Sequence, residues 1–138
     1  MTFHVVVVMS VWTFGLLQAV PLQAQSSGES GASLFSTYCA TCHGTSAKGD
    51  GPLASSLTRK PADLTQIAKQ NGGTFPSERV AQTIDGRTPV KGHGGGEMPI
   101  WGDAFAKSRA DSTPPEEKIR RLVRHIEGIQ EKQEKQEK

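Results

Sequence analysis

The stretch Gly31-Ala-Ser-Leu-Phe-Ser-Thr-Tyr-Cys39-Ala-Thr-Cys42-His43-Gly44 decides the fold of this 138-residue chain. It holds the only two cysteines, three positions apart, and an imidazole directly after the second. This spacing lets two thiols form thioethers with the two vinyl groups of one haem while the imidazole reaches the iron. The stretch therefore predicts one haem c, attached covalently through Cys39 and Cys42, with His43 as an iron ligand.

Three other uses of the cysteine pair compete with haem. A disulfide between Cys39 and Cys42 would not require His43. A redox-active dithiol is expected after a strand in a βαβ unit, and no strand pattern precedes Cys39. A zinc site needs about four ligands, and no second cysteine pair exists to complete one. Covalent haem accounts for all three residues together.

The composition also favours a domain built around a cofactor. Hydrophobic residues make up 35% of the chain and aromatic residues 6%, so a core made of side chains alone would be thin. Small domains of this kind usually need disulfides, a metal or a large cofactor. Gly (15) and Pro (8) are frequent, which predicts long loops. The net charge of +2 argues against a nucleic-acid partner.

The amino-terminal segment predicts export. The first 24 residues contain no Asp, Glu, Lys or Arg, and Val5–Leu17 is almost wholly apolar. Residues 1–24 therefore fit a secretory signal peptide, with cleavage after Ala24 or after Ser26. The rival reading is an uncleaved membrane anchor, because 5–22 is just long enough to span a bilayer. Both readings place the domain outside the cytoplasm, in the periplasm or an equivalent compartment.

The remaining pattern predicts an all-α fold. A linker (25–30) leads into one domain (31–128), and the last residues (129–138) form a charged Gln-Glu-Lys tail. We expect this tail to be a frayed helix or disordered, because no apolar residue follows Ile129. We expect helices at 31–42, at 64–70 after the N-cap Asp63, and from Pro76 to a stop at Gly86. A last helix is expected after the N-cap Thr113, with Pro114 in its first turn. Its apolar stripe consists of Ile119, Leu122, Val123 and Ile126.

Between the last two helices, Thr88–Gly102 holds five glycines and two prolines. Both residue types interrupt regular structure. We therefore expect this segment to be an extended loop throughout.

The segment 31–44 resembles the N-terminal helix of class I cytochromes c, the monohaem family with His and Met ligands. The resemblance covers residues 31 to 127, through Gly49-Asp-Gly-Pro52, Pro61-Ala-Asp-Leu64 and Met98-Pro-Ile-Trp-Gly102. It implies a small fold in which the first and last helices cross and long loops surround one haem. It further implies that the carbonyl of Pro52 accepts a hydrogen bond from His43. Gly31 and Phe35 would meet the last helix at His125.

The sixth iron ligand follows by elimination. Met1, Met9 and Met98 are the only methionines, and the first two lie in the presumed signal peptide. Met98 is therefore the thioether that remains in the domain, and a thioether ligand raises the potential relative to a second imidazole. His93 is the competitor, in a glycine-rich approach to Met98, and we expect it to face solvent instead.

Two further features bear on the site. Trp101 either packs beside the haem or donates its indole N–H to a propionate, or else it is an ordinary core residue. Five basic residues are candidates to ring the exposed haem edge and to steer docking of an acidic partner: Lys48, Lys60, Arg87, Lys91 and Lys107.

These features together predict single-electron transfer between periplasmic or membrane redox partners. The chain would be a carrier and not an enzyme in its own right. One variant of this function is a cytochrome subunit of a dehydrogenase or oxidase complex. An alternative class is a haem enzyme or gas sensor with a labile sixth ligand.

Overall fold

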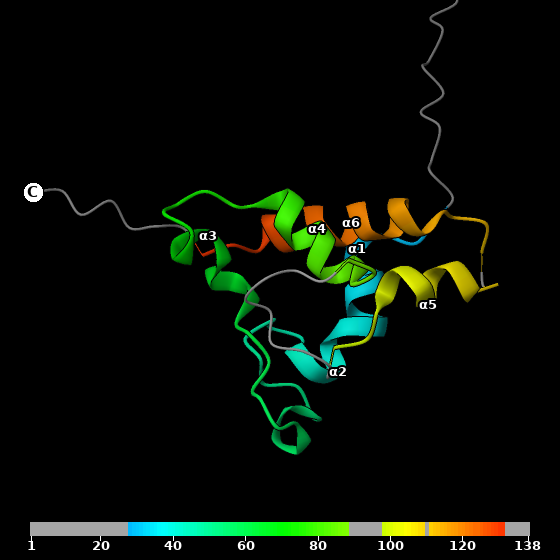
Figure 1. Ribbon diagram of the computed structural model, residues 1–138. Coiled ribbons are helices and arrows are strands. Elements are labelled where there is room, and N and C mark those ends of the chain that lie inside the picture. Colours follow the sequence, from blue (N-terminus) through cyan, green and yellow to red (C-terminus); the bar gives the residue numbers. More distant parts are fainter. Residues whose placement is uncertain (1–27, 89–97, 110, 132–138) are drawn as a thin grey trace, which may run out of the picture.

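The computed structural model describes residues 28–88, 98–109 and 111–131. Within these ranges the chain forms helices and loops and no strand, so the prediction of an all-α fold is confirmed. The elements are α1 (Gly31–Leu34), η1 (Phe35–Cys39), α2 (Ala40–His43), η2 (Ala54–Ser56), η3 (Leu64–Gln66), α3 (Ile67–Gln70), α4 (Ser77–Asp85), α5 (Trp101–Lys107) and α6 (Pro115–Gly128). Figure 1 shows α6 crossing the helix that starts with α1, with α4 and α5 beside them. No helix in the described ranges has the length and apolarity needed to cross a bilayer.

The first three elements run on as one helix, as the sequence predicts for 31–42. Ser30 caps its start, since its Oγ accepts from the N–H of Ser33 at 3.1 Å. Gly44, with φ of 80°, ends it directly after His43. Within it, Phe35–Cys39 forms a π-helix, a wider turn often found at functional sites, which no sequence pattern predicted. The two cysteines and His43 therefore lie on the last turns of this helix.

The last helix packs its apolar stripe into the core. Ile119, Leu122, Val123 and Ile126 are all buried, as the sequence predicts. The helix crosses α1 closely at His125, whose ring lies 5.3 Å from that of Phe35. The contact between the first and last helices that the family resemblance implies is thus present.

The start of α6 differs from the prediction. The helix begins at Pro115, and Pro114, not Thr113, is the N-cap. A residue that precedes proline is disfavoured in the α conformation, so Pro114 cannot be the first helical residue. It takes a ψ of 146° instead. The N–H of Thr113 is bound by Asp111 Oδ1 at 2.7 Å.

The short helices around the middle of the chain lie where the sequence places them. Asp63 caps η3 by accepting from the N–H of Thr65 at 2.9 Å, and α3 ends at Gln70. Helix α4 begins directly after Pro76, which is its N-cap and not, as predicted, a residue of its first turn. It stops as predicted at Gly86, whose φ of 69° favours glycine.

Helix α5 corrects the prediction of a loop to Gly102. Trp101 and Phe105 stand one turn apart on it, and their rings lie 5.5 Å apart. Gly102 lies within this helix, and a side chain there would collide with Asp85 of α4. The missing side chain of Gly102 allows α4 and α5 to pack closely, and this glycine does not break the helix.

Candidate cofactor-binding site

One large cavity lies between the first helix, the α3–α4 region and the segment that leads into α5. Its volume is about 880 Å³, within the usual range for a sizeable ligand. Cys39, Cys42, His43, Met98 and Trp101 all line it. Most of the other lining side chains are apolar or aliphatic, and they include Tyr38, Leu57, Leu64, Ile67, Val80, Ile84, Ile100 and Ile126.

The two cysteines are free thiols in the structure. Cys39 is buried and Cys42 is half-buried. Burial, and to a smaller extent the neighbouring Cys42, raises the pKa of the Cys39 thiol to about 12. Cys39 is thus held as a neutral thiol facing an apolar cavity. In the described residues, no group of three or more His, Cys, Asp or Glu side chains gathers around a point where a metal ion would sit.

The imidazole of His43 is oriented by a carbonyl on the opposite side of a long loop. Its Nδ1 lies 3.1 Å from the carbonyl oxygen of Ala62, so an N–H at Nδ1 donates to that oxygen. Burial lowers the pKa of His43, and the bond to Ala62 opposes this shift. The ring is therefore held as a neutral imidazole with one nitrogen already engaged, the form in which a histidine binds a metal.

The expected role of Pro52 is corrected by this bond. Pro52 is exposed, and the peptides beside it are used elsewhere. The N–H of Gly51 donates to Cys42 O at 3.1 Å, and the N–H of Leu53 donates to Thr41 O at 3.0 Å. This part of the loop therefore caps the end of α2, and the carbonyl that bonds to the His43 ring belongs to Ala62.

Met98 and Trp101 reach the cavity from the segment that precedes and begins α5. The side chain of Met98 is 40% exposed, although it is apolar, and it lines the cavity that His43 lines. Trp101 also lines the cavity while packing on Tyr38, with ring centroids 5.5 Å apart. Trp101 therefore packs against a core side chain and also faces the cavity, and its contact with a haem or a propionate stays a prediction. His93 and Lys91 lie outside the described residues.

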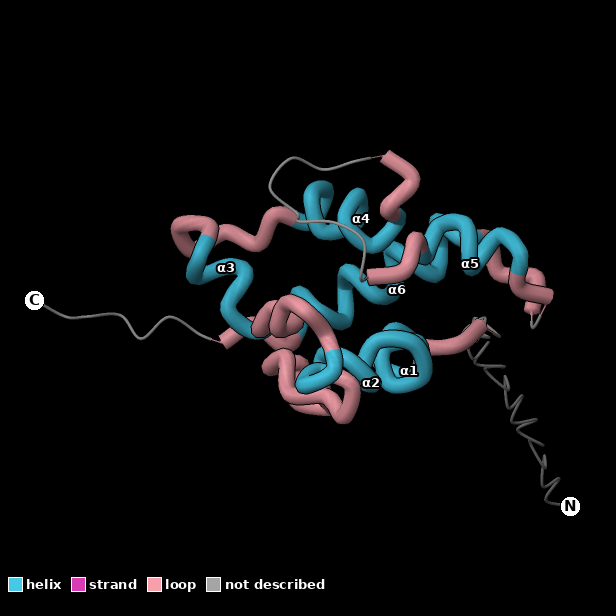
Figure 2. The backbone as a smooth tube through the Cα atoms, turned by 60° about the horizontal axis from the view of Figure 1, so that its bottom comes forward, coloured by secondary structure: helices cyan, strands magenta, loops and turns pink. Residues whose placement is uncertain are grey.

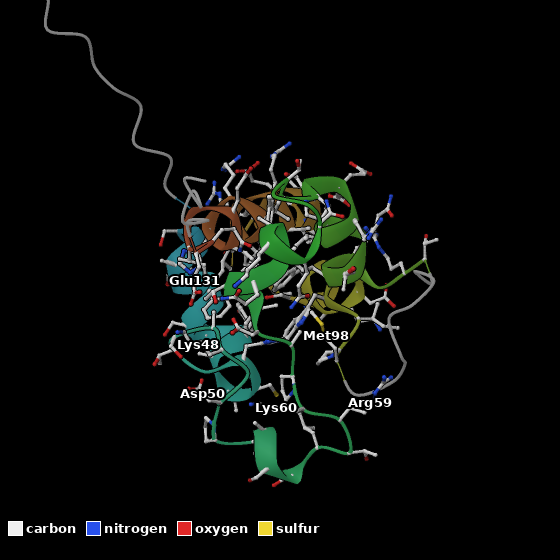
Figure 3. All side chains as sticks on the ribbon, turned by 90° about the vertical axis from the view of Figure 1, so that its left-hand side faces the viewer. Lys48, Asp50, Arg59, Lys60, Met98 and Glu131 are labelled. Carbon is white, nitrogen blue, oxygen red and sulfur yellow. The ribbon has the colours of Figure 1, made fainter. Side chains whose placement is uncertain are left out.

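Of the basic residues singled out in the sequence, Lys60 lines the cavity. Lys48 pairs with Glu131 at 3.2 Å, and Arg87 pairs with Asp85 and Glu116. Lys107 is exposed at the end of α5 and does not line the cavity. Sequence reasoning missed Arg59 and Arg79, which do line it. Figure 3 shows Lys60 and Arg59 on the same side of the molecule as Met98.

The cavity fits the cofactor that the sequence predicts. A covalent c-type haem needs two thiols, an imidazole and apolar walls, and all of these meet at one cavity. The thioether of Met98 joins the same lining.

The comparisons with known proteins agree with this reading. A family model described as "Cytochrome C oxidase, cbb3-type, subunit III" matches residues 26–126, which is most of the chain. Neither a curated protein nor a solved structure was found to match the chain.

Proposed function

Because the chain belongs to the cytochrome c oxidase, cbb3-type, subunit III family, we propose that Cys39 and Cys42 carry its haem and that His43 and Met98 bind the iron. A domain of this family binds haem c covalently and transfers electrons. The haem supplies a one-electron change between Fe(III) and Fe(II). One observation carries the residue assignment: both thiols, the imidazole and the thioether line a single cavity, although Met98 lies far from His43 in the sequence.

Each residue has a distinct task in this proposal. The thiols of Cys39 and Cys42 fix the ring against the first helix. His43, oriented by Ala62, supplies a strong nitrogen ligand, and the soft thioether of Met98 favours the reduced iron. The indole N–H of Trp101 would donate to a haem propionate. The apolar walls exclude water, which keeps the site in a low dielectric and influences the potential.

The ligand assignment is tested with carbon monoxide on the reduced, haem-loaded protein. Wild-type protein is expected to resist carbon monoxide at neutral pH, because His43 and Met98 would both hold the iron and leave no free position for the gas. Met98→Ala should give high-spin iron that binds the gas rapidly. His93→Ala is the matched control and should leave the spectrum unchanged. Rapid, stoichiometric binding by the wild type would instead favour a haem enzyme or gas sensor.

The domain works with redox partners, and cytochrome domains of this family are generally exported. We propose that this chain acts in the periplasm, after cleavage of residues 1–24, as a carrier for, or a bound subunit of, an oxidase complex. The family description supports the oxidase. Gentle purification from membranes distinguishes the two roles, since a subunit travels with its complex and a carrier does not. Amino-terminal sequencing of that sample tests the cleavage.

The rim of the cavity suggests the chemistry of the partner's surface. Arg59, Lys60 and Arg79 line the cavity together with the exposed, apolar Ile100. A basic rim around an apolar patch favours an acidic partner and speeds its association at low salt. We expect Lys60→Glu to slow electron transfer to an acidic redox protein and to weaken its salt dependence. The control Lys107→Glu, at a residue that does not line the cavity, should change the electron-transfer rate and its salt dependence less.

A further inference from the structure

Two residues of the charged tail, Gln130 and Glu131, do not behave as a solvated tail. Gln130 Nε2 donates to Leu64 O at 2.7 Å, and its Oε1 accepts from the N–H of Ala68 at 2.8 Å. The N–H of Glu131 donates to Thr65 O at 2.9 Å. The tail prediction is therefore wrong for these two residues, which we call the C-terminal clasp. Residues 132–138 lie outside the described ranges.

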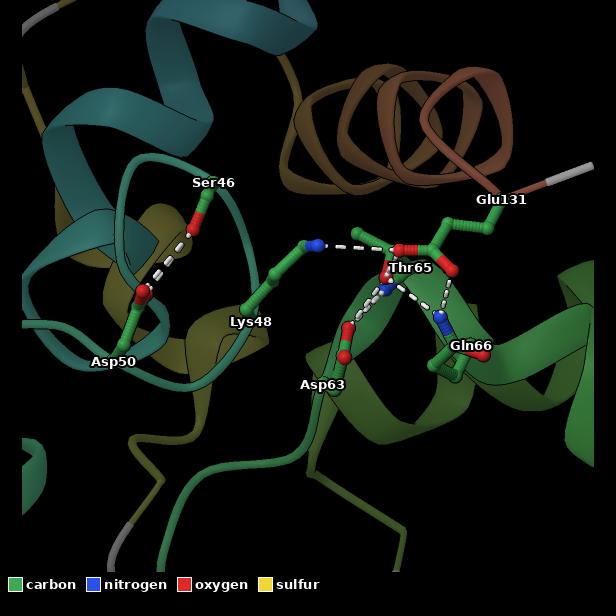
Figure 4. Close-up of polar contacts among 7 residues, drawn as sticks. All are labelled: Ser46, Lys48, Asp50, Asp63, Thr65, Gln66 and Glu131. Carbon is green, nitrogen blue, oxygen red and sulfur yellow. Dashed lines mark hydrogen bonds and ion pairs between the residues drawn. The ribbon is translucent and has the colours of Figure 1, made fainter.

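The carboxylate of Glu131 joins this clasp to a second segment. It accepts from Thr65 Oγ1 at 3.4 Å and from the side-chain amide of Gln66. It also pairs with Lys48 Nζ at 3.2 Å, in the loop that follows the first helix. Figure 4 shows Glu131 between Lys48 and Gln66, with Asp63 bonded to Thr65 beneath it. The clasp thus ties three separated parts of the chain to one another.

The segment held by the clasp is the one that orients His43. Ala62 lies two residues before Leu64, and its carbonyl oxygen lies 3.1 Å from His43 Nδ1. The N–H of Leu64 donates to Ala47 O at 2.8 Å, so the segment is fixed on one side to the loop after the first helix. Gln130 and Glu131 fix its other side to the end of α6. Because the segment is attached on both sides, these two sets of hydrogen bonds determine the distance between the Ala62 carbonyl and the His43 ring.

We propose that Gln130 and Glu131 are positioning residues that hold the Ala62 carbonyl on His43 and thereby influence the reduction potential. This rests on His43 being the iron ligand proposed above. A hydrogen bond from the distal nitrogen of a ligating histidine raises the basicity of the ligand and fixes its ring. A more basic ligand stabilises Fe(III) and lowers the potential. The clasp therefore acts on the iron through one backbone carbonyl, without touching the haem.

Gln130 and Glu131 are expected to contribute unequally to holding the Ala62 carbonyl in place. The ion pair of Glu131 with Lys48 is about half exposed on both sides, and exposed pairs contribute little. The amide of Gln130 is partly buried and bonds to Leu64, Ala68 and Ile126 at once. Loss of the Gln130 amide would leave a carbonyl and an N–H of the held segment without this partner. Gln130 should therefore have the larger effect on the position of this segment.

The test uses the full-length, haem-loaded protein with the variants Gln130→Ala and Glu131→Gln. Two quantities are measured: the reduction potential, and the exchange rate of the His43 Nδ1–H by NMR in the reduced state. Gln130→Ala should accelerate this exchange by about tenfold or more, since a local opening then has fewer hydrogen bonds to break. Its potential should become more positive. Glu131→Gln should change both in the same direction and by less. Glu127→Ala, an exposed glutamate of α6, is the matched control and should change neither.

The outcomes separate this inference from the ligand assignment. Unchanged exchange and potential in Gln130→Ala would overturn the positioning role, even if the melting temperature fell, because a merely structural contact predicts that pattern. If the wild type lacked the low-spin spectrum of a His- and Met-ligated haem, the ligand assignment itself would fail and the inference with it. A wild type with that spectrum and a variant with altered exchange and potential is the expected result.

Discussion

Gly31 stands where the first helix and α6 cross, and its missing side chain sets how closely they approach. A Cβ at this position would collide with the carbonyl oxygen of Arg121 and would lie 2.9 Å from the Cβ of His125. Both neighbours belong to one packed helix and cannot move freely. Gly31→Ala should therefore separate the helices and reduce the free energy of unfolding by about 1–3 kcal/mol. Denaturant titration of the haem-loaded protein measures this change.

A second glycine in the same pair of helices provides the control. A Cβ at Gly128 meets nothing within 4 Å. Gly128→Ala should be neutral or should stabilise α6 by up to about 1 kcal/mol, because alanine is the better helix former. Equal destabilisation by both substitutions would show that close approach at Gly31 is not the cause.

At the scale of single residues, the sequence predicted groups that are chemically unusual and missed those that are not. The sequence alone shows a pair of cysteines followed by His43, and one methionine outside the predicted export segment. The oxygen that orients His43 cannot be identified in this way, because Ala62 contributes only a carbonyl and every residue has one. Gln130 was missed for a similar reason: an amide in a polar repeat has no pattern until its partners in a distant segment are known.

Among the elements, some predicted helix boundaries held and others failed. Asp63 and Gly86 act through their own turn, and both ends were predicted. The start of α6 failed for a local reason, because Pro115 moves the N-cap from Thr113 to Pro114.

The prediction at α5 failed because tertiary packing decides this helix. Helix α5 was missed because Gly102 was counted as a loop residue, whereas its glycine serves contact with α4. The spacing of Trp101 and Phe105 was the signal that would have revealed it.

The joint between α5 and α6 contains a buried charge. Lys118 of α6 is 2% exposed, its Nζ lies 3.2 Å from Asp111 Oδ1, and it sits 5.6 Å from the ring centroid of Phe105. The N–H of Thr113 and the ammonium of Lys118 hold the pKa of Asp111 below its usual value. A carboxyl whose pKa is lowered in the folded state stabilises that state at pH values above the pKa of the unfolded chain, which is about 3.9 for Asp. The contribution is lost as the pH falls through the lowered folded value.

Asp111→Asn should therefore lower the melting temperature at neutral pH, because Lys118 stays buried without its carboxylate. The difference from wild type should shrink as the pH falls from about 7 to 3, where the wild-type carboxyl also takes up a proton. Thermal melts across that range measure it. Asp103→Asn, an exposed acidic residue of α5, is the control. A difference that stays constant over the whole pH range would contradict the ion pair as its origin.

For the molecule as a whole, the cavity lies where a core would otherwise be. Leu64, Ile67, Val80 and Ile84 all present apolar surface to a space of about 880 Å³. With so few hydrophobic residues in the chain, the protein's own core cannot close this space. The cofactor then completes the core, and binding to the folded state alone stabilises that state by mass action. Folding and cofactor attachment are expected to be coupled.

The double substitution Cys39→Ala, Cys42→Ala tests this coupling by removing both attachment points while leaving the helix surface almost unchanged. The variant should retain no haem after denaturing gel electrophoresis. Its far-ultraviolet circular dichroism should show reduced helicity and a broad melt in place of a cooperative one. A chain that melted cooperatively at the wild-type temperature without haem would show that the helices pack on their own. The single variants should each keep one thioether and fall between these extremes, because one remaining bond still holds the ring in the cavity.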